Sequence, residues 1–293
     1  TVKQVLEILI TEDVCDFIET DLRGNIFEDL TLYNLCNPYT IIGDLIVANG
    51  ATLTIEPGVQ IEFEGPYSIT VIDGAKLMSL GSEEDSITIS GISWNGIDIK
   101  TPGSMIQYTR IIEEGNSSQG DYLLKLTGSH IDKSHIYGGA RGIQLNDSSI
   151  VSRSKIHDIR NEAIQLYQRS VAYGNTLYDI GTDMNYDAAV QTYDRSYFLN
   201  NKVYSTLDDP NTIAVAAQSS GVIAGNTIGS DKGIHGKFGI YVREGGQVEV
   251  VGNRIGGFNT NVVLIGTRPE FKDNTFMGEL DSEAKQMNVR RSE

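Results

Sequence analysis

The amino-acid sequence predicts an all-β solenoid, a chain that coils repeatedly so that short strands stack around one continuous core. Three observations lead to this fold: a triplet of residues recurs along most of the chain, a second triplet recurs between its copies, and no helical period separates the two. The chain has 293 residues, of which 40% are hydrophobic. It is therefore long enough for a substantial core and too apolar for a disordered chain.

The first triplet is a small polar residue, any residue, and then an aliphatic residue or Phe. Its polar positions are 20 to 27 residues apart, a spacing typical of one solenoid coil. Because the side chains of a strand alternate between its two sides, we expect the third position of each triplet to point into the core. The eight triplets begin at Thr109, Ser134, Ser154, Asn175, Asn201, Asn226, Asn253 and Asn274.

The second triplet lies upstream of the later polar positions, and most of its copies have an apolar residue on either side of a central one. Its copies begin at Ile143, Ile164, Val190, Ile240 and Val263. This alternation is typical of a strand with one buried side. Equivalent strands in successive coils are expected to pair in parallel, about 4.8 Å apart.

Five of the first triplets begin with Asn, and we expect these residues to form a ladder in successive turns. Asn tolerates the left-handed backbone conformation of sharp turns, and its amide forms hydrogen bonds with nearby backbone groups. A structural ladder is favoured over a binding site for this column.

Both ends of the chain lose the pattern. Residues 1–37 are predicted to be an N-terminal cap and lead-in with an amphipathic helix over residues 2–10, residues 38–276 the solenoid, and residues 277–293 a C-terminal cap or tail. Caps are expected because the end coils of a solenoid expose the core. Cys15 and Cys36 are one coil length apart, so they are either bridged, in an exported protein, or two buried free thiols.

Residues 39–115 carry a resemblance to a known family. They contain the segments YTIIGD (39–44), ATLTIEPG (51–58), VQIEF (59–63), SGISWNGI (90–97) and IQYTRII (106–112). These segments resemble the opening coils of the right-handed parallel β-helix repeat proteins that many bacteria export. The downstream Gly-Ile-x-Leu and Gly-Asn-x-Ile repeats resemble the carbohydrate-binding and sugar-hydrolase repeat, which also occurs in pectate lyases, polygalacturonases and alginate-modifying enzymes.

The resemblance covers roughly residues 38–276 and implies a single-stranded right-handed parallel β-helix of the pectate-lyase-like fold. It also implies an extracellular, cell-surface or periplasmic location, with polysaccharide as the ligand. The catalytic motifs of those enzymes are incomplete: the chain has no Tyr-Gly-Phe-Asp-Pro-His stretch, and only Asp208-Asp209 and the Ile-His-Gly around His235 are similar to the polygalacturonase set. Whether the protein is an enzyme stays open. If it is one, a polysaccharide lyase or glycoside hydrolase is expected, with Asp208, Asp209, His235 and Lys237 as the catalytic candidates.

Coil length indicates where a site would lie. The extra residues of the longer coils fall in the turn before the second triplet, at 113–122, 179–187, 206–211 and 229–238. Two short turns, at 137–142 and 157–162, lie between the first two of these. Long loops on either side of two short ones would leave a notch at one edge of the solenoid, and rigid scaffolds commonly present functional residues on such loops.

The notch edge gathers charged groups of both signs. β-Elimination of a uronate needs a carboxylate neutraliser, a base and a proton donor, whereas glycoside hydrolysis needs two carboxyl groups. Either set can be assembled here, although the alternative is that these loops are simply solvated. The substrate-binding candidates are Arg160, Glu162, Asp187, Tyr241 and Arg243, together with Gln144, Gln165 and Gln191, three amides in one outward column that suit either hydroxyl recognition or an inter-coil ladder.

The abundant Tyr residues of these coils either stack on sugar rings, where they are exposed, or cap the core, where they are buried. Trp94 is expected to be structural, and His130 and His135 to be ordinary surface residues outside the notch. No metal site is predicted, and calcium is the one cofactor with candidate ligands, the carboxylates of Asp179, Asp183, Asp187, Asp208 and Asp209.

The formal net charge of −16 argues against nucleic acid as a partner, since such binding depends on Lys and Arg. No apolar run is long enough to insert into a membrane. The sequence therefore favours an exported β-helix protein that binds or cleaves polysaccharide on its lateral face. The alternative is a non-catalytic cell-surface adhesin, spacer or fibre segment. The two differ in whether the edge groups converge within hydrogen-bonding distance.

Overall fold

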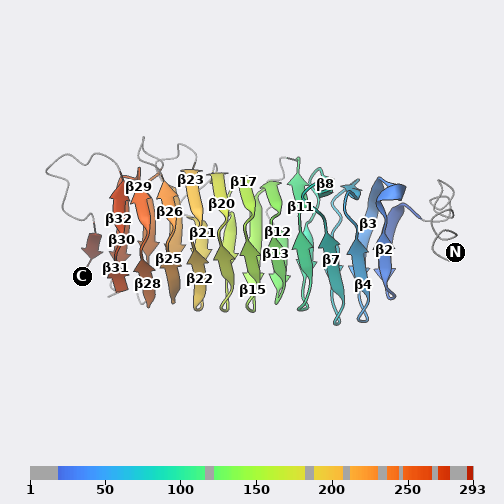
Figure 1. The fold of residues 1–293 in the computed structure, drawn as a ribbon, viewed down its shortest axis with the longest axis horizontal. Helices are drawn as coiled ribbons and strands as arrows, with labels where there is room; N and C mark the ends of the chain where they lie inside the picture. Colours follow the sequence, from blue (N-terminus) through green and yellow to red (C-terminus); the bar gives the residue numbers. More distant parts are fainter. Residues whose placement is uncertain are drawn as a thin grey trace, which may run out of the picture.

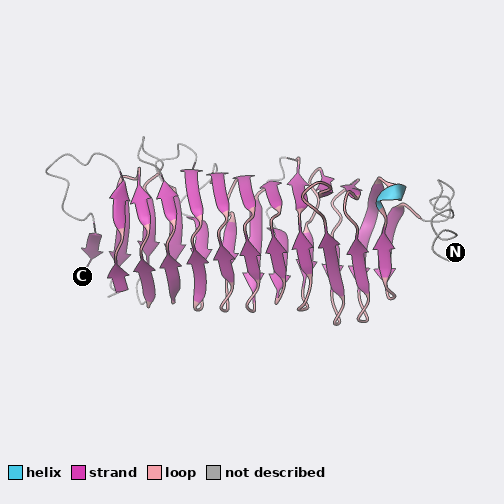
Figure 2. Ribbon diagram, in the orientation of Figure 1, coloured by secondary structure: helices cyan, strands magenta, loops and turns pink. Residues whose placement is uncertain are grey.

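A computed structural model describes residues 19–115, 122–181, 188–206, 212–229, 236–243, 247–265, 270–277 and 289–292. Within these residues the chain coils into the all-β parallel solenoid that the repeats predict (Figure 1). Figure 2 shows that strands dominate, and the helical structure in this part of the chain is one 3-10 turn, η2 (Asn34–Cys36). The helix predicted over residues 2–10 lies outside the described residues.

The strands form three rows, which we call the first, second and third faces. Two long strands, β1 (Asp21–Ile26) and β3 (Tyr39–Val47), run along both the first and the second face. Because β3 pairs with β5 at its start and with β6 at its end, the first two faces join into one 22-stranded sheet. The third face is a separate sheet of 11 strands.

Parallel pairing between successive coils builds each face. The first face contains β5 (Gln60–Phe63), β8 (Ile87–Gly91), β11 (Thr109–Glu113), β14 (His135–Gly138), β17 (Lys155–Ile159), β20 (Thr176–Ile180), β23 (Lys202–Thr206), β26 (Thr227–Gly229), β29 (Arg254–Gly256) and β32 (Thr275–Met277). The second face contains β6 (Ile69–Val71), β9 (Ile97–Ile99), β12 (Tyr122–Thr127), β15 (Arg141–Asn146), β18 (Ile164–Leu166), β21 (Ala188–Thr192), β24 (Ile213–Ala217), β27 (Phe238–Val242), β30 (Thr260–Ile265) and β33 (Val289–Ser292).

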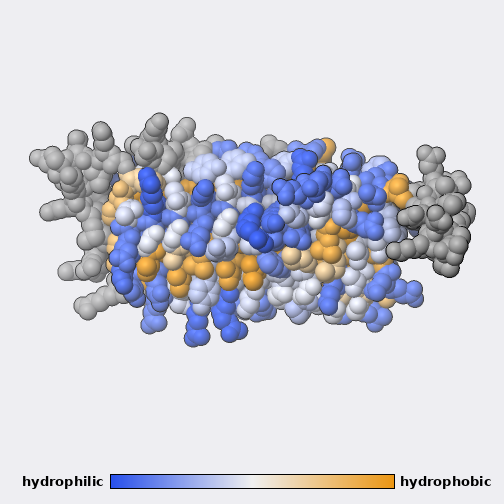
Figure 3. Space-filling view, in the orientation of Figure 1, coloured by the Kyte–Doolittle hydropathy of each residue, from blue (hydrophilic) through white to orange (hydrophobic). Residues whose placement is uncertain are grey.

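The third face lies below the first in Figure 1, where β22, β25 and β28 are seen beneath β23, β26 and β29. Figure 3 shows an apolar band over the third face in the C-terminal half of the molecule. Partly exposed outward residues such as Val171, Val222 and Val251 belong to this face. Its strands are β2 (Leu30–Leu32), β4 (Thr52–Ile55), β7 (Lys76–Leu80), β10 (Met105–Gln107), β13 (His130–Asp132), β16 (Ile150–Ser152), β19 (Val171–Tyr173), β22 (Ser196–Leu199), β25 (Gly221–Ala224), β28 (Val248–Val251) and β31 (Glu270–Lys272).

The core is built from stacked aliphatic columns, one of which the first triplets predict. Backbone pairing places the third residue of each triplet directly beside its counterpart in the next coil. The members are fully buried apart from the last, Phe276, which is half-buried. The predicted stack is therefore confirmed, and it consists of Ile111, Ile136, Ile156, Leu177, Val203, Ile228, Ile255 and Phe276.

The second triplets are confirmed with one correction to their register. Ile143, Ile164 and Val190 pair in order, and Val215 continues the column to Ile240. The last member is Val262 rather than Val263, because Ile240 pairs with Val262. Every residue from 262 to 265 is apolar, so the sequence there has no polar–apolar alternation to fix the register.

The Asn column forms the predicted ladder. Asn201, 1% exposed, donates from Nδ2 to Ala172 O (2.9 Å) and to Asn226 Oδ1 (3.2 Å), and its own Oδ1 accepts from the backbone N–H of Asn175 (2.9 Å). The left-handed conformation expected for these Asn residues is wrong. It falls on the residue just before each of them instead: Gly174, Asn200, Gly225, Gly252 and Asp273. Hydrogen bonding, not backbone conformation, therefore explains the column.

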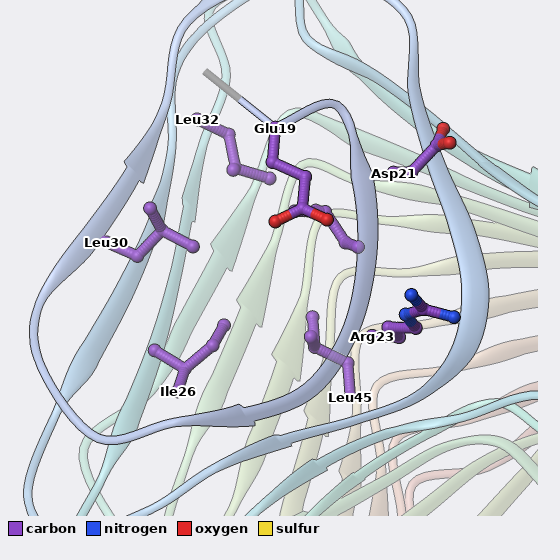
Figure 4. Close-up of a pocket in the computed structure, with 8 residues that line it drawn as sticks. Glu19, Asp21, Arg23, Ile26, Leu30, Leu32 and Leu45 are labelled. Carbon is purple, nitrogen blue, oxygen red and sulfur yellow. The ribbon is translucent and has the colours of Figure 1, made fainter. Parts of the chain in front are cut away.

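At the N-terminal end, β1 and β2 lie upstream of residue 38. They already pair with β3 and β4 of the solenoid, respectively. A cavity of about 360 Å³ lies here, and Figure 4 shows Leu30, Leu32, Leu45 and Glu19 around it. The caps over residues 1–37 and 277–293 stay predictions. Cys36 is disulfide-bonded, and Cys15 lies outside the described residues. In the described part of the chain, no helix is long and apolar enough to cross a membrane.

Candidate functional site

The strand bounds reproduce the length pattern of the edge between the first and second faces. Two connections are short: β14 ends at Gly138 and β15 begins at Arg141, and β17 ends at Ile159 and β18 begins at Ile164. The connections on either side, from β11 to β12 and from β20 to β21, are longer. The two short turns are tighter than predicted, since Arg141 and His157 belong to strands. His157 therefore lies on the first face and not at the edge.

A polar network covers the second face beside these short connections. Arg141 donates from Nε to Glu162 Oε2 (2.9 Å), and Gln191 donates from Nε2 to Glu162 Oε1 (3.4 Å). Gln165 donates from Nε2 to Gln191 Oε1 (3.3 Å). Glu162 is only 3% exposed, so its charge depends on these donors. The network joins three successive coils, because β15, β18 and β21 are neighbours.

Two tyrosines hold the amides in place. Tyr167 donates from its hydroxyl to Gln165 Oε1 (3.0 Å), and Tyr193 donates to Gln191 Oε1 (2.7 Å). Their rings stack with centroids 4.5 Å apart and planes 11° apart. Burial, together with the neighbouring Tyr167, raises the pKa of Tyr193 to about 12. Both hydroxyls are therefore donors at neutral pH, since burial also raises the pKa of Tyr167.

Arg141 completes the network on the side of the preceding coil. Its guanidinium carbon lies 5.6 Å from the centroid of the Tyr122 ring, a cation–π distance. Burial raises the pKa of Tyr122, and the charge of Glu162 adds to this effect. Amide, carboxylate, guanidinium and phenol groups are thus gathered in one patch, in which Glu162, Gln165 and Gln191 are 3%, 9% and 4% exposed. Such a set recognises ligands rich in hydroxyl groups.

The structure brings together three of the predicted binding residues, Glu162, Gln165 and Gln191. The alternative of an inter-coil amide ladder also holds between Gln165 and Gln191. Gln144 precedes them in the same column, where it pairs with Lys125 and Gln165. Tyr241 lies two coils beyond Gln191 in that column, with Ala216 between them.

Three further predicted residues lie around this patch. Arg243 is close enough for its charge to lower the pKa of Tyr193 against the larger effect of burial. Arg160 lies in the short connection after β17, where its N–H donates to Gly139 O (3.2 Å). Lys237 places Nζ 5.2 Å from the Phe238 ring centroid, two coils beyond β21. The remaining candidates, Asp187, Asp208, Asp209 and His235, lie outside the described residues.

The calcium hypothesis stays a prediction, because Asp183, Asp187, Asp208 and Asp209 also fall outside the described residues. Among the residues that the structure does describe, no group of three or more His, Cys, Asp and Glu side chains is placed to hold a metal ion.

The predicted substrate-binding set omitted Tyr122, Tyr167 and Tyr193, and also Arg141, which was expected only as one of the charged groups of the short turn at 137–142. A signal for two of them is present in the sequence: Tyr167 and Tyr193 follow Gln165 and Gln191 by two residues. Residues two apart in an extended chain point to the same side. Arg141 and Tyr122 carry no such signal, since the strand bounds decide their place beside Glu162.

On the first face, Tyr residues stack on one another rather than cap the core, and Tyr204 at the end of the stack is 42% exposed. Tyr137, His157, Tyr178 and Tyr204 stack on one another in successive coils, with neighbouring planes 6° to 11° apart. Stacking occupies the ring faces that a sugar would need. Trp94, in contrast, is structural as predicted: it is buried against Phe63 and donates from Nε1 to Ile112 O (3.1 Å).

Two histidines predicted to be ordinary surface residues have specific contacts. His135, on the first face, is packed against Tyr137 and His157. Burial, with the charges of His157, Lys155 and Arg110, lowers its pKa to about 4. His130, on the third face, shares a hydrogen bond of 3.1 Å between its Nε2 and Ser152 Oγ.

The fold and this patch define a parallel β-solenoid protein with a polar network on the outside of one face. No family model matches the chain, and no curated protein is significantly similar to it in sequence.

Solved structures are similar to it in architecture. A double mutant of the periplasmic alginate epimerase AlgG has 12% sequence identity over 90% of this chain and 79% of its own, with a TM-score of 0.48. A single mutant of AlgG has the same identity and coverage, with a TM-score of 0.38. A further AlgG structure has 11% identity over 86% of this chain and 73% of its own, with a TM-score of 0.32. Likeness at this level says nothing about the activity of this chain.

Proposed function

We propose that this protein is exported and binds a polysaccharide chain along the outer surface of its second face. The observation that carries the proposal is the network of Glu162, Gln165 and Gln191, three largely buried side chains that join successive coils on the outer side of the second face. A solenoid repeats its outward groups at the coil spacing of about 4.8 Å. Such a row of donors and acceptors suits a ligand that is itself a chain of repeating units.

Preorganisation supports this proposal. Both oxygens of Glu162 accept hydrogen bonds, and each Gln amide is oriented by a tyrosine hydroxyl. Groups that are already fixed lose little conformational freedom when a ligand binds.

Charge indicates the kind of polysaccharide. Lys125 lies in the amide column, and Arg141 and Arg243 lie beside it, so the patch is more positive than the protein as a whole. The formal net charge of −16 nevertheless repels a densely anionic polymer. Neutral or sparsely charged chains are therefore the favoured ligands.

Catalysis is a second part of the proposal. We assign any lyase or glycoside hydrolase chemistry to Asp208, Asp209, His235 and Lys237. Lys237 directly precedes β27 of the second face, which supports this edge of the solenoid as the location of such a catalytic site. A double replacement of Asp208 and His235 by Ala should abolish the release of unsaturated products or reducing ends. Binding should persist, because the Glu162 network is unchanged.

A glycan array tests the binding proposal. Wild-type protein should retain a defined set of glycans, and Tyr193→Phe should weaken that binding about tenfold, since it removes the hydroxyl that orients Gln191. Tyr178→Phe is the matched control, because it removes one Tyr hydroxyl from the stack on the first face. If wild-type protein binds no glycan and releases no product, the polysaccharide proposal fails. The adhesin, spacer or fibre alternative would then replace it.

A further inference from the structure

The ring stack of the first face contains a histidine that cannot turn freely. His157 lies between Tyr137 and Tyr178, with ring centroids 4.9 Å and 4.4 Å away and interplanar angles of 6° and 11°. Its side chain is only 11% exposed. The stack therefore holds the imidazole plane of His157 in one orientation.

A second histidine meets it from the preceding coil. His135 is on β14 and His157 on β17, two paired strands, and their ring centroids are 4.6 Å apart. A hydrogen bond joins His135 Nε2 to His157 Nε2. The two Nε2 atoms therefore face each other across neighbouring coils.

The other nitrogen of His157 has a carboxylate partner. His157 Nδ1 donates to Asp158 Oδ2 at 2.6 Å. A carboxylate accepts a hydrogen bond, so this contact favours the tautomer with the proton on Nδ1, in which the lone pair of Nε2 is directed at His135. A carboxylate on the far nitrogen is the usual outer partner of a metal-binding histidine.

We propose that His135 and His157 bind one divalent transition-metal ion through their two Nε2 atoms, with Asp158 as the positioning residue. Imidazole nitrogens suit Cu²⁺, Ni²⁺ and Zn²⁺, and Cu²⁺ is expected to bind most tightly among them. Two protein ligands leave coordination positions for water or an anion. This site is independent of the proposed polysaccharide surface, since it lies on a different face.

The charges around the pair shape its expected behaviour. Arg110 and Lys155 are the neighbours of His135 in its own column, one in the preceding coil and one in the next. Both repel a cation, whereas Asp158 attracts it. Arg110 also donates to Tyr137 Oη (3.0 Å), which directs part of its charge toward that ring. Removal of the positive charge of Lys155 should therefore tighten metal binding.

Calorimetric titration of untagged, chelator-treated protein with CuCl₂ tests the site, with electron paramagnetic resonance to count the nitrogen ligands. We expect one equivalent of Cu²⁺ with two imidazole nitrogens. His135→Gln should weaken binding at least about tenfold and leave one nitrogen at the metal. His157→Gln should do the same, and because that residue lies in the stack, its melting curve is measured alongside.

Three other variants sharpen the result. Asp158→Asn should weaken Cu²⁺ binding by about tenfold, and Lys155→Gln should strengthen it. His130→Gln is the matched control, a histidine on the third face whose loss should change nothing. The proposal is overturned if wild-type protein binds Cu²⁺ no more tightly than His135→Gln, or if His130→Gln removes the site.

Discussion

The outward columns of the first and second faces show how one scaffold produces two kinds of surface. Both lie directly above aliphatic core columns that run through the same coils. On the first face, Tyr137, His157 and Tyr178 stack ring on ring. On the second face, Gln165 and Gln191 form an amide row joined to Glu162.

The difference lies in which groups remain available to a ligand. A ring inside the stack has both faces covered by its neighbours, so the column stabilises the coils, and the end ring, Tyr204, is the one that is 42% exposed. An amide has more donors and acceptors than one neighbour can use. Repetition therefore covers the ring faces within the aromatic column, whereas each amide keeps hydrogen-bonding groups beyond those that one neighbour uses, with Gln165 and Gln191 9% and 4% exposed.

The largest expected effect is on stability, through the hydrophobic core that the two faces share. Val203→Asp or Ile228→Asp should lower the free energy of unfolding by several kcal/mol, because each places an unpaired charge in a fully buried column. Chemical denaturation would measure this loss. Lys202→Asp is the matched control, since the neighbouring side chain on β23 is exposed. Wild-type stability in either core variant would show that the column is not the core.

The next effect concerns the Asn ladder, which lies where the third face passes into the first. Asn201→Ala should cost about 2 to 3 kcal/mol, since it leaves the buried backbone N–H of Asn175 and the buried carbonyl of Ala172 without their partner. Asn274→Ala should cost less, because that last described rung is only half-buried. Equal losses in thermal or chemical denaturation would contradict a graded ladder.

A smaller effect is expected when two buried carboxylates are compared: Asp132, which is structural, and Glu162, which belongs to the proposed site. Asp132, 2% exposed, accepts from Arg153 Nε (2.7 Å) and from its NH2 nitrogen (2.5 Å). Burial would raise the pKa of Asp132, but hydrogen bonds from Arg153 and Ser152 hold it below its usual value. Folding then favours the ionised form, so this stabilisation is present above the ordinary carboxyl pKa and is lost as the pH falls through the lowered one.

Arg153→Gln should therefore lower the melting temperature by a few degrees at neutral pH. At acidic pH, the difference in melting temperature between this variant and the wild type should become smaller. Glycan binding should stay unchanged. Arg141→Gln, the matching change beside Glu162, should lower both stability and glycan binding. Melting curves from pH 3 to pH 7 and a binding assay compare the two variants. Loss of glycan binding in Arg153→Gln would show that the two carboxylates do not differ in role.

The solenoid could be predicted because each coil repeats the same alternation of inward and outward residues. Val203 and Ile228 can be recognised as core residues from their place in this repeat, without knowledge of their spatial neighbours. The Gln144, Gln165 and Gln191 column followed from the same period. Arg141 was not predicted as a partner of Glu162, because the strand register decides which residues of two successive coils lie side by side. The pairing of His135 with His157 was also missed: they occupy different columns, so no repeat aligns them. Asp208 and His235 stay predictions of the sequence.

The most direct test of the central claim compares one outward residue from each face. Isothermal titration calorimetry would measure the affinity of the tightest oligosaccharide from the array for Gln191→Leu and for Tyr178→Leu. We expect Gln191→Leu to weaken binding at least about tenfold, because it removes the centre of the amide network. Tyr178→Leu should leave affinity within about twofold and reduce only stability, by about 1 kcal/mol. The reverse order, or equal affinities for both variants, would contradict the account.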